Sequence, residues 1–162
     1  MRRPRAPLHP VFAHFTIALT ASSLAFDAGG RLFGAASLAA AGCWTLAAAV
    51  ALTPLTLASG VASRVRLPMA EGEARSVLRA HMALGPIFYG LLLCAALWRG
   101  ALWQRDAAPP AAYLISLGAV TLVMTVQGYL GGELVYRFGA AVEGRYRRLA
   151  SAEDGAAPGT TA

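Results

Sequence analysis

Residues 10–27 read PVFAHFTIALTASSLAFD, an apolar run of 18 residues with no formal charge before Asp27. At a rise of about 1.5 Å per residue, such a run forms a helix of about 27 Å, close to the thickness of a bilayer's hydrocarbon core. A helix of a soluble bundle would carry a polar face, which this run lacks. A signal peptide is disfavoured because His14 would interrupt its apolar core. The run therefore predicts a membrane-spanning helix.

Three more apolar blocks follow, at Leu32–Ser59, Arg79–Trp98 and Ala111–Leu130. Of the 162 residues, 57% are hydrophobic and only 14% are charged, whereas a soluble domain carries about 25% charged residues. The four blocks predict an all-α fold, an integral membrane four-helix bundle of up-down topology. We expect one domain over residues 1–150 and a disordered tail over residues 151–162.

Glycine pairs predict where two of the helices end. Gly29-Gly30 is expected to close the first helix, and Gly131-Gly132 to break the chain after the fourth. The segment Glu133–Leu149 then predicts a C-terminal amphipathic helix on the membrane surface. Its apolar residues recur at helical spacing: Leu134, Val135, Phe138, Val142, Tyr146 and Leu149.

The arginines predict the orientation of the chain in a bacterial inner membrane. Eleven lie before the first block, between the second and third, or after the fourth, and three lie on the opposite side. Positive residues concentrate in cytoplasmic loops, so both termini are expected in the cytoplasm. The net charge of +6 suits anionic lipid headgroups and does not require nucleic acid as a partner. The sequence leaves the oligomeric state open.

The chain's three histidines, His9, His14 and His81, lie near the starts of apolar blocks. An imidazole is costly in hydrocarbon, so such histidines usually serve a function. A haem b takes two axial imidazoles from different helices. His9 and His14 point about 140° apart around a helix and cannot act as a pair. His14 and His81 are expected at equal depth on diagonal helices, as axial ligands in an electron-transfer module.

Other residues would complete such a haem site. Gly85 and Gly128 would offer flat surfaces beside the porphyrin, and Arg79 and Arg137 would pair with its propionates. Gln127 is expected to donate a hydrogen bond to a histidine or to the carbonyl of a quinone.

Two other interpretations remain open at this point. In the first, the three histidines build a metal or proton site. In the second, they only connect helices in a non-catalytic accessory or small-solute membrane protein. Acidic residues occur only at the ends of the blocks, and no hydrolase or phosphate-binding motif is present.

The opening His9-Pro-Val-Phe-Ala-His14-Phe-Thr-Ile-Ala-Leu19 resembles the H-P-x-x-x-H-F-P-I-A-L signature of a bacterial membrane family, domain of unknown function 2231. Thr16 replaces the family's usual proline. His81 with Gly85, and the stretch Gly131–Gly139, are also similar. The resemblance implies a four-span module that is sometimes attached to Rieske or cytochrome c domains. It therefore favours electron transfer, here with a separate redox protein as partner.

Overall fold

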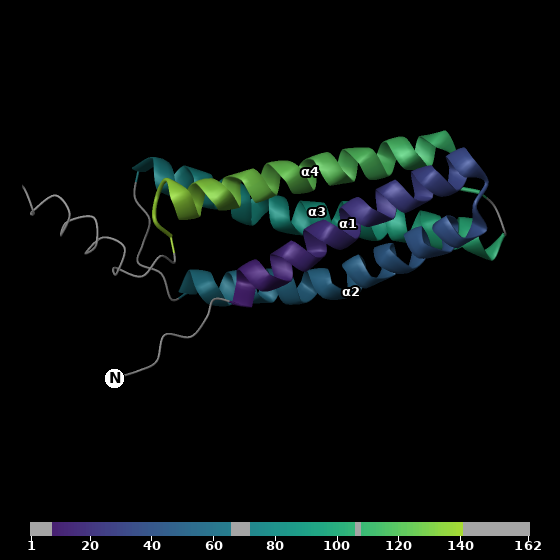
Figure 1. Cartoon of the computed structure of the whole chain (residues 1–162). Helices are drawn as coiled ribbons and strands as arrows, with labels where there is room; N and C mark the ends of the chain where they lie inside the picture. Colours follow the sequence, from purple (N-terminus) through teal and green to yellow (C-terminus); the bar gives the residue numbers. More distant parts are fainter. Residues whose placement is uncertain (1–7, 66–71, 106–107, 141–162) are drawn as a thin grey trace, which may run out of the picture.

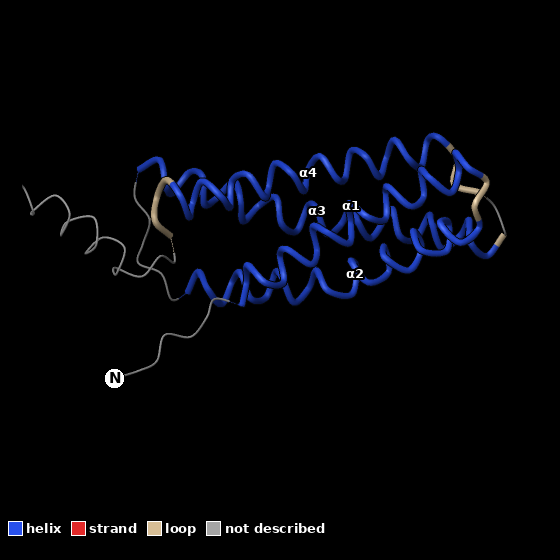
Figure 2. Tube along the Cα trace, viewed as in Figure 1, coloured by secondary structure: helices blue, strands red, loops and turns tan. Residues whose placement is uncertain are grey.

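The computed structural model describes residues 8–65, 72–105 and 108–140, and in these residues the chain is helical with no strands (Figure 2). The four helices run alternately up and down along one bundle (Figure 1). They are α1 (Leu8–Phe33), α2 (Ala36–Val65), α3 (Gly72–Gln104) and α4 (Ala111–Tyr136). Each is long and apolar enough to cross a membrane. The predicted all-α, four-span fold is confirmed.

The prediction that Gly29-Gly30 ends the first helix is wrong. α1 continues to Phe33, and Gly34 follows it in the left-handed region at φ +64°. Gly30 instead serves close packing, because a Cβ there would lie 2.9 Å from the backbone nitrogen of Ala39. A glycine at this position lets the backbones of α1 and α2 approach one another.

The predicted break at Gly131-Gly132 is also absent, since α4 runs through both glycines to Tyr136. The turn that ends α4 contains Gly139 at φ +65°, and the N–H of Ala140 donates to the carbonyl of Leu134 at 2.7 Å. The predicted surface helix Glu133–Leu149 therefore does not begin as a separate helix, because residues 133–136 are the last turn of α4. Its part beyond residue 140 and the tail 151–162 lie outside the described residues.

The bundle consists of two helical hairpins. α1 packs most extensively on α2, and α3 on α4, whereas contacts between the hairpins are fewer. In the described part of the chain the backbones of α1 and α3 do not approach one another closely, so the two helices lie diagonally as predicted. The hydrophobic core draws on α2, α3 and α4: Leu46, Ala49, Phe88, Leu92, Ala95, Tyr113, Leu117, Val120 and Met124.

The buried face of α1 differs from this core because its residues are polar or lack a side chain. It consists of Thr16, Thr20, Ser23, Asp27 and Gly30, spaced three or four residues apart. The Thr16 and Thr56 hydroxyl oxygens lie 2.8 Å apart, and Ser23 donates to the carbonyl of Gly42 at 2.9 Å. Small polar residues of this kind let membrane helices approach closely and form hydrogen bonds.

Candidate functional site

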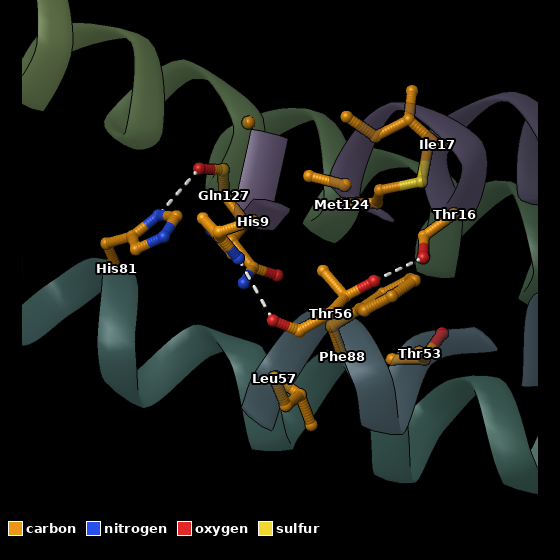
Figure 3. A pocket seen from close by; sticks show the side chains of 12 residues that line it. His9, Thr16, Ile17, Thr53, Thr56, Leu57, His81, Phe88, Met124 and Gln127 are labelled. Carbon is orange, nitrogen blue, oxygen red and sulfur yellow. Dashed lines mark hydrogen bonds between the residues drawn. The ribbon is translucent and has the colours of Figure 1, made fainter. Parts of the chain in front are cut away.

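A pocket of about 60 Å³ lies between the hairpins, at the end of the bundle where α1 and α3 begin (Figure 3). Its walls come from all four helices, and both His9 and His81 contribute to them. The remaining lining residues mix small, polar and apolar side chains: Ala13, Thr16, Ile17, Thr53, Thr56, Leu57, Phe88, Met124, Gln127 and Gly128.

His9 is held by the α1–α2 hairpin. Its Nδ1 lies 3.0 Å from the backbone carbonyl oxygen of Thr56 and 3.4 Å from the Ser59 hydroxyl. A carbonyl only accepts hydrogen bonds, so Nδ1 is the donor and carries the proton. In the neutral ring Nε2 then has a free lone pair.

His81 is held in the same way by the α3–α4 hairpin. Its Nδ1 donates to the backbone carbonyl of Gln127 at 3.0 Å. The two ring centres are 6.3 Å apart and their planes are nearly perpendicular, at 86°. Among the described residues neither Nε2 atom has a hydrogen-bond partner. Two imidazoles, each with Nδ1 bonded to a backbone carbonyl and Nε2 without a partner among the described residues, therefore share one pocket.

Two glycines leave space for these rings to pack on the neighbouring helices. A Cβ at Gly60 of α2 would lie 3.0 Å from Cε1 of His9, and a Cβ at Gly131 of α4 would lie 3.1 Å from Cε1 of His81. Both distances are at or below the usual limit of van der Waals contact for carbon. Each imidazole ring thus packs on a helix backbone at a position where a side chain larger than glycine would collide with it.

The expected pairing of His14 with His81 is not formed, and His9 takes that place. His14 lies on an exposed face of α1, its Nδ1 bonded to the carbonyl of Pro10, and does not line the pocket. The reason is rotational, because α1 already begins at Leu8 and His14 points about 140° away from His9. Equal depth in the membrane is therefore not enough to bring two rings together, because the face of the helix decides which ring lines the pocket.

The other predicted site residues are placed as follows. Gln127 and Gly128 line the pocket, but the backbone carbonyl of Gln127, and not its side chain, contacts His81. Gly85 is buried behind the pocket, where a Cβ would lie 2.9 Å from Leu57 and 3.1 Å from the amide nitrogen of Gln127.

The two arginines expected at the propionates lie outside the pocket. Arg79 is exposed on α3. Arg137 forms ion pairs with Glu73 at 2.8 Å and with Glu133 at 3.4 Å. Its guanidinium therefore ties the beginning of α3 to the end of α4.

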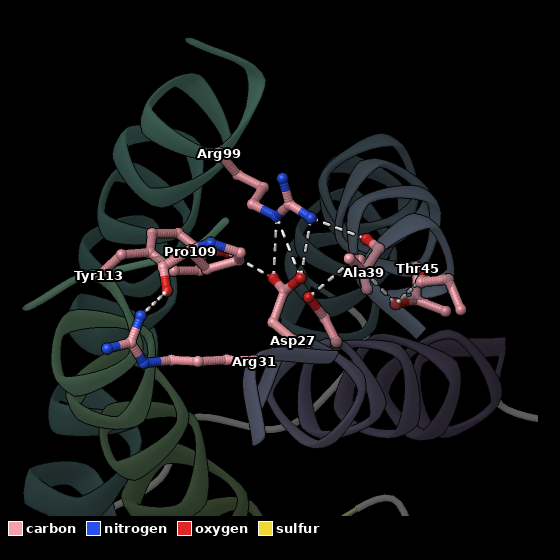
Figure 4. A network of polar contacts seen from close by, with 10 residues as sticks. Asp27, Arg31, Ala39, Thr45, Arg99, Pro109 and Tyr113 are labelled. Carbon is pink, nitrogen blue, oxygen red and sulfur yellow. Dashed lines mark hydrogen bonds and ion pairs between the residues drawn. The ribbon is translucent and has the colours of Figure 1, made fainter. Parts of the chain in front are cut away.

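A second polar cluster, which was not predicted from the sequence, lies at the opposite end of the bundle and is drawn in Figure 4. Asp27 and Arg99 form an ion pair at 3.0 Å, with side chains exposed by only 0% and 2%. Arg99 Nε also donates to the Asp27 carboxylate, and Tyr113 Oη donates to Asp27 Oδ2 at 3.2 Å. The sequence predicts that the first span ends at Asp27, whereas α1 continues for six more residues.

This cluster connects all four helices. Arg99 Nη2 donates to the carbonyl of Ala39 on α2 at 2.7 Å, and Arg31 donates to the carbonyl of Pro109 at 3.1 Å. Gly42 leaves room for the carboxylate, because a Cβ there would lie 2.7 Å from Asp27 Cγ. The sequence does hold a signal, since the small polar residues of α1 recur at helical spacing and end on Asp27.

The described residues contain no group of three or more His, Cys, Asp or Glu side chains that would hold a metal ion. His9, His14 and His81 therefore do not form the three-histidine site that the sequence left open. What the structure offers is a site with two imidazoles.

Comparison with known proteins gives one match. The family described as predicted membrane protein (DUF2231) matches residues 5–144. No curated protein and no solved structure matches the chain.

Proposed function

Because the chain belongs to the DUF2231 family of predicted membrane proteins, we propose that it acts within the membrane, as an electron-transfer module. In this proposal His9 and His81 would hold one haem b through their imidazole nitrogens. The observation that carries the proposal is the pair of imidazoles in one pocket, each with Nδ1 bonded to a backbone carbonyl and Nε2 unused. Histidines that bind metals are commonly oriented by such a bond from the other ring nitrogen.

The spacing of the rings supports a metal between them. Metal–nitrogen bonds of about 2 Å, with about 1 Å from each nitrogen to its ring centre, put two axial imidazoles about 6 Å apart. The observed ring centres are 6.3 Å apart. Diagonal helices are also suitable, since axial ligands must approach a haem from opposite faces.

The donor set fits haem b, but the pocket as it stands is too small for the porphyrin. Its volume is about 60 Å³, whereas pockets for cofactors and drug-sized ligands measure about 300–1,000 Å³. The hairpins or the lining side chains must therefore move to admit the ring. The small volume favours a second candidate, a single metal ion that prefers imidazole, such as copper, held by the same two nitrogens.

The residues of the chain would prepare the site in three ways. The carbonyls of Thr56 and Gln127 keep the proton on Nδ1 of each ring, so that Nε2 stays available. Gly60 and Gly131 leave room for the Cε1 edge of each ring to pack on the helix backbone. Apolar side chains such as Phe88 limit water around the site. Haem b would supply a one-electron iron couple when bound.

The proposal also names partners and an orientation. Quinone in the bilayer, or a separate redox protein of the Rieske or cytochrome c type, would exchange the electron. In this proposal the histidine end of the bundle lies on the cytoplasmic side with both termini, which the distribution of arginines in the sequence supports.

Titration of the purified protein in detergent with hemin tests the function directly. We expect a Soret band that saturates at one haem per chain and sharpens on reduction, together with a low-spin signal of two axial imidazoles. A protein that takes up one copper ion per chain and no hemin would support the second candidate. A protein that binds neither would contradict both and leave a non-catalytic accessory role.

Gly131→Ala is expected to weaken the affinity for hemin about tenfold, as loss of a group that orients a metal ligand typically does. The added methyl would press on a ring that cannot turn freely, because His81 is bonded to Gln127. Gly132→Ala is the matched control, because its Cβ would meet only Tyr136 at 3.9 Å. Equal affinities of the two variants would show that the backbone of α4 does not position His81.

A further inference from the structure

Each imidazole is fixed inside its own hairpin. His9 of α1 is bonded to Thr56 of α2, and His81 of α3 is bonded to Gln127 of α4. Neither hydrogen bond crosses between the hairpins. If the hairpins moved apart, each ring would travel with its own carbonyl, and the distance between the rings would change without the loss of either bond.

The buried hydrogen bonds between the hairpins lie at the other end, whereas at the histidine end the hairpins meet through apolar and ring contacts, such as that of Leu57 with Gly85. In the described ranges, every hydrogen bond that a buried or half-buried side chain makes across the hairpins belongs to the cluster around Asp27 and Arg99 or to Arg31. The hydrophobic core extends from Tyr113 toward the histidines only as far as Phe88 and Met124. Figure 1 shows the hairpins close together at the end of the α1–α2 turn and diverging toward the histidine end.

We propose that the two hairpins form a clamp, with the Asp27–Arg99–Tyr113 cluster as its joint and the His9–His81 pocket as its jaws. The clamp opens at the histidine end to admit a group too large for the closed pocket, and it closes when both imidazoles bind that group. The identity of the ligand that the clamp admits rests on the proposed function, whereas the motion of the hairpins does not.

The length of the arm makes small rotations sufficient. His9 and Asp27 are 18 residues apart on α1, which is about 27 Å of helix. Rocking by about 5° around the joint therefore moves His9 by about 2 Å, and rocking by about 15° moves it by about 7 Å. Positions beside the joint barely move.

Distances between spin labels on opposite hairpins test the clamp. In a Cys43→Ser/Cys94→Ser background, Val61→Cys with Tyr129→Cys labels the histidine end, and Trp44→Cys with Ile115→Cys labels the joint end. All four positions are exposed, and both pairs join α2 to α4. Without ligand, we expect the distribution of label–label distances to be about 2 Å or more broader at the histidine end than at the joint end. Saturation with hemin should narrow it and leave the joint end unchanged.

Equally narrow distributions at both ends of the ligand-free protein would overturn the clamp. So would hemin binding that leaves a broad distribution at the histidine end. A protein that fails to bind hemin contradicts the proposed function, yet the ligand-free comparison still decides whether the hairpins move. Asp27→Asn/Arg99→Met should broaden the distribution at the joint end, and an unchanged joint end would show that the cluster is not the joint.

Discussion

Arg99→Met is expected to be the most destabilising of the substitutions considered for this protein, by about 3–5 kcal/mol in the free energy of unfolding. It would leave the Asp27 carboxylate buried and without its counter-ion, since that side chain is 0% exposed. Asp27→Asn should destabilise in the same direction, because it strands the guanidinium. The double variant Asp27→Asn/Arg99→Met removes both charges, and we expect it to recover much of the loss.

Thermal unfolding of the detergent-solubilised variants measures these effects. Arg105→Met is the matched control, because Arg105 is exposed at the end of the same helix. If Arg99→Met unfolded at the same temperature as Arg105→Met, the ion pair would not contribute to stability. A double variant as unstable as the sum of the single ones would mean that Asp27 and Arg99 act independently.

His9→Ala and His81→Ala are each expected to weaken hemin binding more than about 100-fold, beyond the cost of losing an outer partner of a ligand. Each substitution removes one of the two imidazoles that line the pocket. The folded bundle should persist, because each ring makes its hydrogen bonds only within one hairpin. Titration with hemin, followed in the Soret region, gives the affinity of each variant.

His14→Ala separates this assignment from the one that the sequence favoured. His14 is exposed on the outer face of α1, so its loss should leave hemin affinity unchanged. Loss of the Soret band in His14→Ala, with normal binding by His9→Ala, would reverse the assignment and require α1 to rotate. Circular dichroism of the three variants checks that their helices are intact.

The number and type of elements were predictable because hydrocarbon imposes strict requirements. Four apolar runs of membrane length leave little choice but helices, whose backbone groups are satisfied internally. The ends of the helices were less predictable, because a glycine can either end a helix or allow close packing inside one. At Gly34 it ends a helix at positive φ, whereas at Gly30 and Gly131 it permits contact inside one. Sequence alone did not separate these uses.

The candidate site was predicted in its residue type but not in its pairing. That histidines near helix starts would meet between α1 and α3 followed from the cost of burying them. Choosing His9 over His14 required the rotation of α1, which depends on packing against α2. Asp27 was missed for a related reason, because its partner Arg99 is 72 residues away in the chain and both looked like loop charges.

The polar buried face of α1 has a consequence for how the protein is made. α1 is the least apolar of the four spans, with a mean hydropathy of 1.3 against 1.6–1.7 for the others. Its acidic side chain meets a counter-ion only when α3 has been synthesised and inserted. A chain truncated after α2 would therefore carry the Asp27 carboxylate in its first hairpin without the Arg99 counter-ion, which is costly inside a membrane.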